Sequence, residues 1–251
     1  MERSKRNALL AETAHRPWEL PQRAPILSMH WRDLCFLHWP VDPERLRRFL
    51  PPGLELETFE GSAWLGVVPF EMRDTRPIAL PPFPSTANFP ELNLRTYVRA
   101  GDKAGVWFFS LDAASRLAVR GARFGFKLPY FDARMRIERA GGWIDYASER
   151  THRGAPAATF RARYRPLGAL PPAAPDTLEH FLTERYCLYT ADRRGLLRGD
   201  IHHLPWPLQA VDVELEDRAM TALVELDLPD EPPIAHFAGA LDVLAWWPAR
   251  V

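Results

Sequence analysis

The chain has 251 residues, of which 47% are hydrophobic and 12% aromatic, so a packed core is expected and a disordered chain is excluded. Lys plus Arg and Asp plus Glu both number 32, for a net charge of +0, which argues against a nucleic-acid partner held through phosphate contacts. The 25 prolines divide the sequence into short elements, which is typical of strands and turns rather than long helices.

Residues 1–28 are expected to form a lead-in segment, with a short helix followed by a Pro-rich stretch. The apolar run at 7–12 is too short for a secretory signal, and no apolar run approaches the ~18 residues that a membrane-spanning helix needs. Cys35 and Cys187 are far apart and each lies among apolar residues, which favours buried free thiols and a reducing compartment. We therefore expect a cytoplasmic protein without a membrane partner.

The rest of the chain, residues 29–251, is expected to be a single domain because no linker, repeat or change in composition divides it. Helices are predicted after Asp42, which caps a turn beginning at Pro43, and from Asp176, where Glu179 completes a capping box. Strand-like stretches are predicted at 29–40, 54–58, 62–72, 91–98, 106–111, 120–139, 143–150, 157–165, 196–202, 207–216, 220–226 and 234–247. Many short strands with few helices indicate a mainly β protein, either a sandwich or a barrel.

The stretch from Glu91 to Val98 alternates with period two, which predicts a strand with two different faces. One face carries Glu91, Asn93, Arg95 and Tyr97; the other is mostly apolar. Because side chains two residues apart on a strand are ~6.5–7 Å apart, these polar groups can converge on one small ligand. The alternative is an ordinary solvated face, which is common on antiparallel sheets.

Lysine is rare, with three against 29 arginines, and only Lys127 lies between apolar residues. A desolvated lysine has a lowered pKa, and its neutral amine can attack a carbonyl to form a Schiff base. The alternative is a strand lysine that points to solvent. The glycines at 121 and 125 and the proline at 129 suggest bulges or a close backbone approach in the same stretch.

Other chemical motifs are absent from the sequence. It has no H-E-x-x-H, no Cys/His cluster, no G-x-G-x-x-G, no P-loop and no G-x-S-x-G, so neither a metal nor a nucleotide cofactor is expected. His202 and His203 are adjacent, so in a regular strand they point to opposite faces and only one of them can reach a common site. Trp64, Tyr130, Tyr186 and Trp206 are candidates for the wall of a pocket or for the core.

Several segments, taken in order, resemble the YqjF-like family of uncharacterised proteins and cover roughly residues 29 to 215. They are 38–41 (HWPV), 50–54 (LPPGL), 61–70 (GSAWLGVVPF), 91–98 (ELNLRTYV), 128–130 (LPY), 181–186 (FLTERY) and 203–208 (HLPWPL). That family resembles, more distantly, the acetoacetate decarboxylase superfamily. The resemblance implies an antiparallel β-barrel or cone with a polar central cavity and a few peripheral helices.

In the decarboxylases, a lysine of a Gly-Phe-Pro-Lys-Lys stretch forms a Schiff base with a β-keto acid. Glu91 matches a glutamate of that superfamily, and Gly125 begins a stretch similar to the lysine motif. Lys127, however, precedes the proline, on the opposite strand parity, and Tyr130 and Phe131 stand where the paired lysines would be. The decarboxylase activity is therefore not transferred to this chain.

The preferred hypothesis is a barrel-like protein that binds a small organic carboxylate in a polar cavity. The predicted ligand-binding residues are Trp64, Asn93, Arg95, Tyr130, His202 and His203, with Arg95 holding the carboxylate and Glu91 acting as acid or base. The second hypothesis is a lyase, decarboxylase or dehydratase that acts on a keto acid through Lys127. The third is a non-catalytic interaction module with an exposed polar face. Oligomeric state is left open, with a homo-oligomer among the alternatives.

Overall fold

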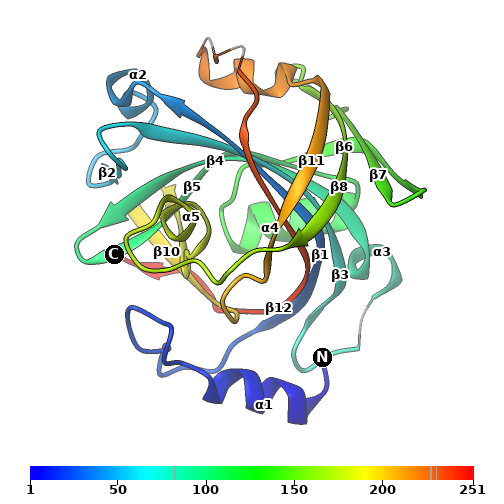
Figure 1. Cartoon of the computed structure of the whole chain (residues 1–251). Coiled ribbons are helices and arrows are strands. Elements are labelled where there is room, and N and C mark those ends of the chain that lie inside the picture. The colour runs from blue at the N-terminus through cyan, green and yellow to red at the C-terminus, as the bar shows by residue number, and fades with distance from the viewer. Residues whose placement is uncertain (82, 227, 230) are drawn as a thin grey trace.

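The computed structural model describes residues 1–81, 83–226, 228–229 and 231–251. The described chain folds mainly into strands, with short helices around them (Figure 1). The helices are α1 (Arg3–Ala11), α2 (Pro43–Arg47), α3 (Pro84–Ala87), α4 (Arg116–Gly125), α5 (Leu178–Thr183) and the 3-10 helix η1 (Ala219–Val224). The strands are β1 (Leu27–Val41), β2 (Glu55–Leu56), β3 (Ala63–Pro77), β4 (Phe89–Ala100), β5 (Lys103–Ala113), β6 (Tyr130–Ala140), β7 (Trp143–Arg150), β8 (Thr159–Ala169), β9 (Cys187–Asp192), β10 (Gly195–His202), β11 (Leu208–Asp217), β12 (Ile234–Ala245) and β13 (Ala249–Arg250).

All these strands belong to one sheet, in the order β13-β10-β9-β5-β6-β7-β8-β11-β12-β1-β3-β4-β2. Two further pairings, β10 with β12 and β4 with β5, join strands that are distant in this order. The pairings therefore close two circuits, a smaller one through β10, β9, β5, β4, β3, β1 and β12, and a larger one through β5, β6, β7, β8, β11, β12, β1, β3 and β4. The strands β1, β3, β4, β5 and β12 belong to both.

The shared strands separate two apolar interiors because their side chains alternate between the two faces. On β4, Leu92 and Leu94 point into a cluster that also holds Tyr146 and Phe160 from the larger circuit. A second cluster on the opposite face contains residues of β1, β3, β5 and α4, including Met29, Phe36, Val68, Phe70, Leu111 and Val119. Phe89, Glu91, Asn93 and Arg95 of β4 face this second interior, so the predicted alternation of the stretch 91–98 is confirmed.

The prediction for residues 120–139 was wrong in its first half, where the chain forms α4 instead of a strand. Ser115 caps this helix, its hydroxyl accepting a hydrogen bond from the backbone N–H of Ala118. Lys127 then adopts a left-handed backbone conformation (φ 57°), which turns the chain toward β6. Of the two glycines at which a bulge or a close approach was expected, Gly125 is closely approached, since a Cβ atom there would lie 2.8 Å from the Trp247 ring, whereas a Cβ atom at Gly121 would meet nothing within 4 Å.

The structure also differs from other predictions in detail. The predicted strand at 220–226 is largely the 3-10 helix η1, and the strand at 54–58 shortens to β2. The sheet is not purely antiparallel, because β5 pairs in parallel with both β6 and β9. In Figure 1, α1 lies at one end of the molecule and α2 at the other. Within the described residues, no helix is long and apolar enough to cross a membrane.

Candidate functional site

A cavity of about 810 Å³ lies inside the smaller circuit of strands. Every strand of that circuit contributes to its wall, for example Trp31 from β1, Phe70 from β3, Leu188 from β9 and Ile201 from β10. Helix α4 adds Leu117, Ala118, Gly121 and Ala122. Most of the lining is apolar, and the polar side chains include the three that the sequence placed on one face of β4.

Glu91 is the most deeply buried carboxyl group of the cavity wall, at 2% exposure. The Tyr130 hydroxyl donates a hydrogen bond of 2.9 Å to Glu91 Oε2. Burial raises the pKa of Glu91 from 4.5 to about 8, and the hydrogen bond from Tyr130 opposes this rise only in part. The Glu91 carboxyl group is therefore mostly protonated at pH 7 and can itself donate a hydrogen bond.

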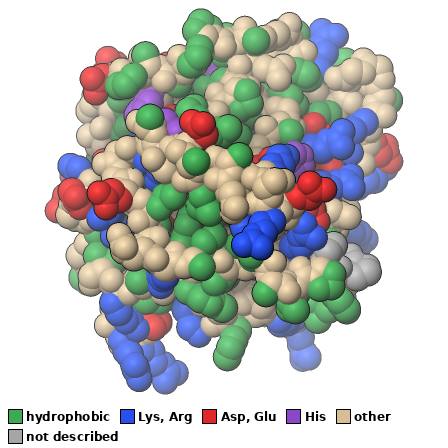
Figure 2. Space-filling view, turned by 90° about the horizontal axis from the view of Figure 1, so that it is seen from below, with side chains coloured by type: hydrophobic (Ala, Val, Ile, Leu, Met, Phe, Trp, Pro, Cys, Tyr) green, Lys and Arg blue, Asp and Glu red, His purple; other side chains and the backbone are tan. Residues whose placement is uncertain are grey.

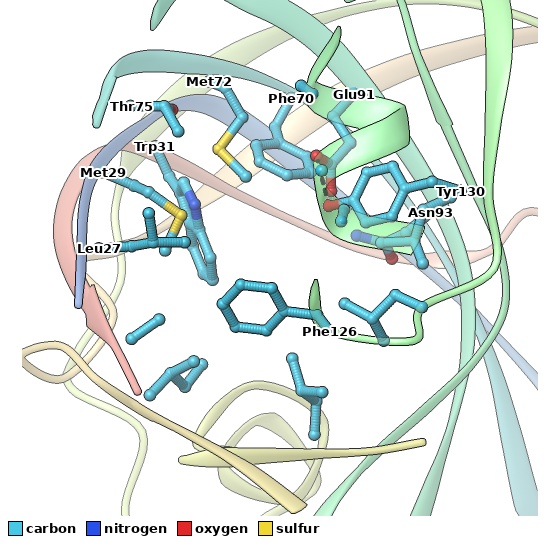
Figure 3. A pocket seen from close by; sticks show the side chains of 18 of the residues that line it. Leu27, Met29, Trp31, Phe70, Met72, Thr75, Glu91, Asn93, Phe126 and Tyr130 are labelled. Carbon is cyan, nitrogen blue, oxygen red and sulfur yellow. Dashed lines mark hydrogen bonds between the residues drawn. The ribbon is translucent and has the colours of Figure 1, made fainter. Parts of the chain in front are cut away.

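Asn93 is the next residue on this face and makes no side-chain hydrogen bond within the described part of the protein, although only 5% of it is exposed. An unpaired buried amide oxygen is unfavourable, since its desolvation is not compensated. In Figure 3, Glu91, Tyr130 and Asn93 lie together on one side of the pocket. This side therefore keeps hydrogen-bonding capacity that the protein itself does not use.

Arg95 completes the polar row. Its Nη2 donates hydrogen bonds to the Tyr97 hydroxyl at 3.3 Å and to the Leu182 backbone oxygen at 3.2 Å, while its Nε is buried without a partner. No carboxylate among the described residues forms an ion pair with it, and its guanidinium carbon lies 5.5 Å from the Phe36 ring centre. Its contacts are thus with neutral groups, and its positive charge is not balanced nearby.

The other cations of the wall differ from Arg95 in this respect. Arg185 forms an ion pair with Glu57, and Arg76 Nη2 lies 3.5 Å from Asp74 Oδ2. His203 also lines the cavity, and burial lowers its pKa to about 4, so its ring is neutral at pH 7. Arg95 is therefore the cation of the described cavity wall that lacks an acidic partner.

Three predicted site residues lie elsewhere. Trp64 packs in a separate cluster with Tyr97 and Leu182 and does not line the cavity, so its predicted role in the pocket wall was wrong. Lys127 is exposed, and its Nζ donates a hydrogen bond of 2.6 Å to the Phe124 backbone oxygen. The expected strand would have been able to turn this amine inward, but the helix end and the left-handed backbone turn it outward.

His202 is the third predicted site residue that lies away from the cavity. Its Nδ1 lies 3.2 Å from Arg16 Nη1, and its Nε2 lies 2.8 Å from the Leu9 backbone oxygen. Because Arg16 can only donate, His202 accepts at Nδ1 and donates from Nε2 to Leu9. The imidazole thus ties the N-terminal segment to β10, and only His203 of the histidine pair reaches the cavity.

Of the other aromatic candidates, Trp206 lines the cavity and Tyr186 does not, but sequence reasoning missed most of the apolar wall, including Met29, Met72 and Phe126. These residues look like ordinary core residues in the sequence, and nothing distinguishes a side chain that packs against another from one that faces a void. Helix α4 was missed for a different reason, since the stretch 120–139 was interpreted as a strand and its glycines as bulges or close approaches. The capping serine at 115 was the signal for it.

The model of the DUF2071 family, described as an uncharacterised conserved protein, matches residues 28–242. The uncharacterised protein YqjF of Bacillus subtilis (strain 168) is 46% identical over 231 residues, which cover 92% of this chain and 94% of YqjF.

Solved structures with a similar fold are much more distant in sequence. Acetoacetate decarboxylase from Legionella pneumophila has a TM-score of 0.62 at 15% identity, covering 97% of this chain and 95% of that chain. The enduracididine biosynthesis enzyme MppR complexed with pyruvate has a TM-score of 0.58 at 14% identity, covering 92% of both chains. At these identities the similarity shows the fold alone.

Proposed function

Starting from a chain that belongs to the DUF2071 family of uncharacterised, YqjF-like proteins and has an acetoacetate decarboxylase-like fold, we propose that it binds a small organic carboxylate in the cavity. The observation that carries the proposal is Arg95, a partly buried cation of the cavity wall without an acidic partner among the described residues. A ligand carboxylate would supply the missing charge and accept a hydrogen bond from the guanidinium donors that Tyr97 and Leu182 do not use.

The neighbours of Arg95 support the same ligand class. Asn93 makes no side-chain hydrogen bond with another described residue, so its Nδ2 can donate to an anion, and the protonated Glu91 has an O–H to donate because Tyr130 already donates to its other oxygen. Donors in a buried site stabilise an anion more than they would in water. Glu91 and Tyr130 also form a proton-holding pair that could serve as general acid, and this is the role we propose for them if the bound molecule reacts.

We further propose that the smaller circuit of strands forms a closed barrel or cone around the ligand. Closed pairing through β10, β9, β5, β4, β3, β1 and β12 supports this shape, and so does the contribution of each of these strands to the cavity wall. In small barrels, inward-facing residues either fill the interior or enclose one small ligand. Here the interior is only partly filled, which favours a ligand.

The two alternatives have less support. A Schiff-base reaction needs an amine in the cavity, but none of the three lysines is among the described residues that line it. An interaction module needs Glu91, Asn93 and Arg95 at the surface, but Glu91 is 2% and Asn93 5% exposed. The structure argues against both alternatives in the form in which the sequence suggested them.

The proposal is tested by titrating the protein with hexanoate and octanoate in a calorimeter, and repeating the titration with Arg95→Met. Hydrogen bonds to a charged group contribute about 1.5–3 kcal/mol, so we expect the variant to bind roughly 10–100-fold more weakly. Arg95→Lys keeps the charge and is expected to recover part of the affinity.

Arg99→Met is the matched control, because Arg99 lies on the same strand and face but is exposed and pairs with Glu57 at 3.7 Å. This control is expected to bind like the wild type. Equal affinity of Arg95→Met and wild type, with both proteins folded, would contradict the proposed role of Arg95. Failure of the wild type to bind any carboxylate would contradict the function itself.

A further inference from the structure

Glu91 and Asn93 lie at one end of the cavity, and most of the remaining lining is apolar, with Thr75 and Arg76 near Leu27 and Met29 among the exceptions. Figure 3 shows Glu91 and Asn93 on one side of the pocket, and Leu27 and Met29 on the other with the Trp31 ring beside them. The apolar wall continues through residues of β3, β5, α4 and the C-terminal segment, among them Met72, Val106, Phe108, Leu117, Phe126 and Trp247. A polar head and an apolar body would each find a matching surface.

The depth of burial orients these two ends. Glu91 and Asn93 are 2% and 5% exposed, whereas Leu117 and Trp247, which also line the cavity, are 55% and 50% exposed. Glu91 and Asn93 thus lie at the inner end, and the half-exposed Leu117 and Trp247 lie at the side that opens to the surface. Seen from the end of the molecule at which α1 lies, hydrophobic side chains are visible in a hollow of the surface (Figure 2).

The volume of the cavity points to a ligand larger than a three- or four-carbon keto acid. Pockets of roughly 300–1,000 Å³ enclose drug-sized molecules, and this cavity of about 810 Å³ is in the upper part of that range. A small keto acid bound at Arg95 would leave the apolar walls around Met29, Trp31 and Met72 facing water. Covering them with an apolar body is favourable, since it removes hydrophobic surface from water.

From these observations we infer that the ligand is an amphipathic monocarboxylate with a long apolar body. Its carboxylate lies at the inner end beside Arg95 and Asn93, and its apolar body extends along Met29 and Trp31 toward the opening. This inference rests on the proposed carboxylate-binding function and adds the size, the polarity and the direction of the ligand.

A carboxylate at the inner end of the cavity needs a cation there, and its position decides where the apolar body lies. An anion taken out of water must be paired with a cation and hydrogen-bonded, and Arg95 is the unpaired cation of the described wall. The apolar body enters last and stays nearest the opening, where the half-exposed Leu117 and Trp247 lie. Each methylene of the body that enters the cavity is then expected to increase affinity until the chain reaches the opening.

The test measures the affinities of straight-chain carboxylates from butyrate to dodecanoate by calorimetry, with decanol as a probe that lacks the charge. Affinity is expected to rise about fourfold per methylene, or roughly 15-fold per two-carbon step, and then to level off. Decanol is expected to bind at least tenfold more weakly than decanoate.

A variant that fills the outer part of the cavity sharpens the test. Leu27→Trp adds volume to the apolar wall and is expected to weaken dodecanoate binding at least tenfold while leaving butyrate unchanged. Leu167→Trp makes the same change at a position that is 61% exposed on β8, and is expected to change neither affinity.

The outcomes separate this inference from the function on which it rests. Rising affinity along the series, with loss of the long chains alone in Leu27→Trp, supports the inference. Equal affinity for butyrate and dodecanoate overturns it and leaves carboxylate binding intact. Decanol binding as tightly as decanoate, with no effect of Arg95→Met, overturns the carboxylate head and therefore both proposals.

Discussion

Two buried carboxyl groups lie on neighbouring strands and have different partners. Glu91 on β4 and Asp112 on β5 are next to each other in the strand register, since Leu92 pairs with Asp112, and they are 2% and 1% exposed. Asp112 Oδ1 accepts a hydrogen bond of 2.9 Å from Arg150 Nε, and the two groups form an ion pair in which both are buried. Glu91 has only the hydroxyl of Tyr130.

Asp112 is a structural carboxylate, whereas Glu91 is a candidate functional one. Burial raises the pKa of both groups, but the charge and hydrogen bond of Arg150 hold that of Asp112 at about 6, while Glu91 reaches about 8. At pH 7 Asp112 is therefore mostly an anion matched inside the fold, and Glu91 is mostly a neutral acid at a cavity. A buried group without a matched partner is a sign of a site for something outside the chain.

The largest effect is expected from Glu91→Gln, as a function of pH. Between pH 4.5 and 8 the unfolded chain releases the proton that folded Glu91 keeps, so the wild type loses stability as pH rises, by at most about 5 kcal/mol (about 3.5 pH units at 1.36 kcal/mol each). Glutamine does not titrate and still accepts the hydrogen bond from Tyr130. The variant is expected to be about 1 kcal/mol less stable at pH 5 and more stable than the wild type at pH 9.

This crossing is measured by urea unfolding from pH 5 to 9. Asp112 titrates in both proteins, so its contribution cancels in the difference between them. Glu149→Gln, at an exposed carboxylate 3.9 Å from Arg134, is the control and is expected to show no crossing. Parallel curves for wild type and Glu91→Gln would mean that Glu91 is ionised in the folded protein, and the contrast with Asp112 would disappear.

The next largest effect is expected from Arg150→Met, which removes the partner of Asp112. The substitution leaves a buried carboxyl group without a counter-charge and also removes a guanidinium that lies 4.1 Å from the Phe131 ring centre. Breaking one side of a buried ion pair costs about 3–5 kcal/mol, so the free energy of unfolding should fall by that amount at pH 7. Ligand affinity in the folded variant should be unchanged, because neither residue lines the cavity.

Arg134→Met is the matched control for this prediction, since Arg134 is 76% exposed in its side chain and its ion pair is on the surface. It is expected to change stability by less than about 0.5 kcal/mol. If Arg150→Met proved equally mild, the Asp112 pair would not be structural, and the two carboxyl groups would have to be regarded as alike.

The sequence was sufficient to predict one side of this comparison. The period-two pattern from Glu91 to Val98 assigned Glu91, Asn93 and Arg95 to one face of a strand, and the structure brings all three to the cavity. Tyr130 was chosen from its type, and it meets Glu91. This was predictable because the face to which a strand residue points depends only on whether its position is odd or even.

The ion pair of Asp112 with Arg150 was not predictable in this way. The two residues are 38 positions apart, and an aspartate followed by alanines gives no sign of its partner. The predicted catalytic role of Lys127 depended on a strand, but the chain forms a helix and a left-handed turn there. Which residues border a void depends on how the whole circuit of strands closes, and that is a property of long-range pairing.

The smallest effect is expected from Lys127→Ala. This substitution tests whether the cavity at Glu91 is a catalytic site that uses a lysine. The Lys127 amine is exposed, and its Nζ donates a hydrogen bond to the Phe124 backbone oxygen, so Lys127→Ala should change stability by less than about 0.5 kcal/mol. Incubation with pyruvate or acetoacetate followed by borohydride should leave the mass of the peptide around Lys127 unchanged in the wild type. A stable adduct on Lys127 that is absent from Lys127→Ala would show that this amine reaches a bound keto acid, and Glu91 would then have to act beside a Schiff base. Without an adduct, the neutral Glu91 and the unpaired Arg95 remain the groups on which binding depends.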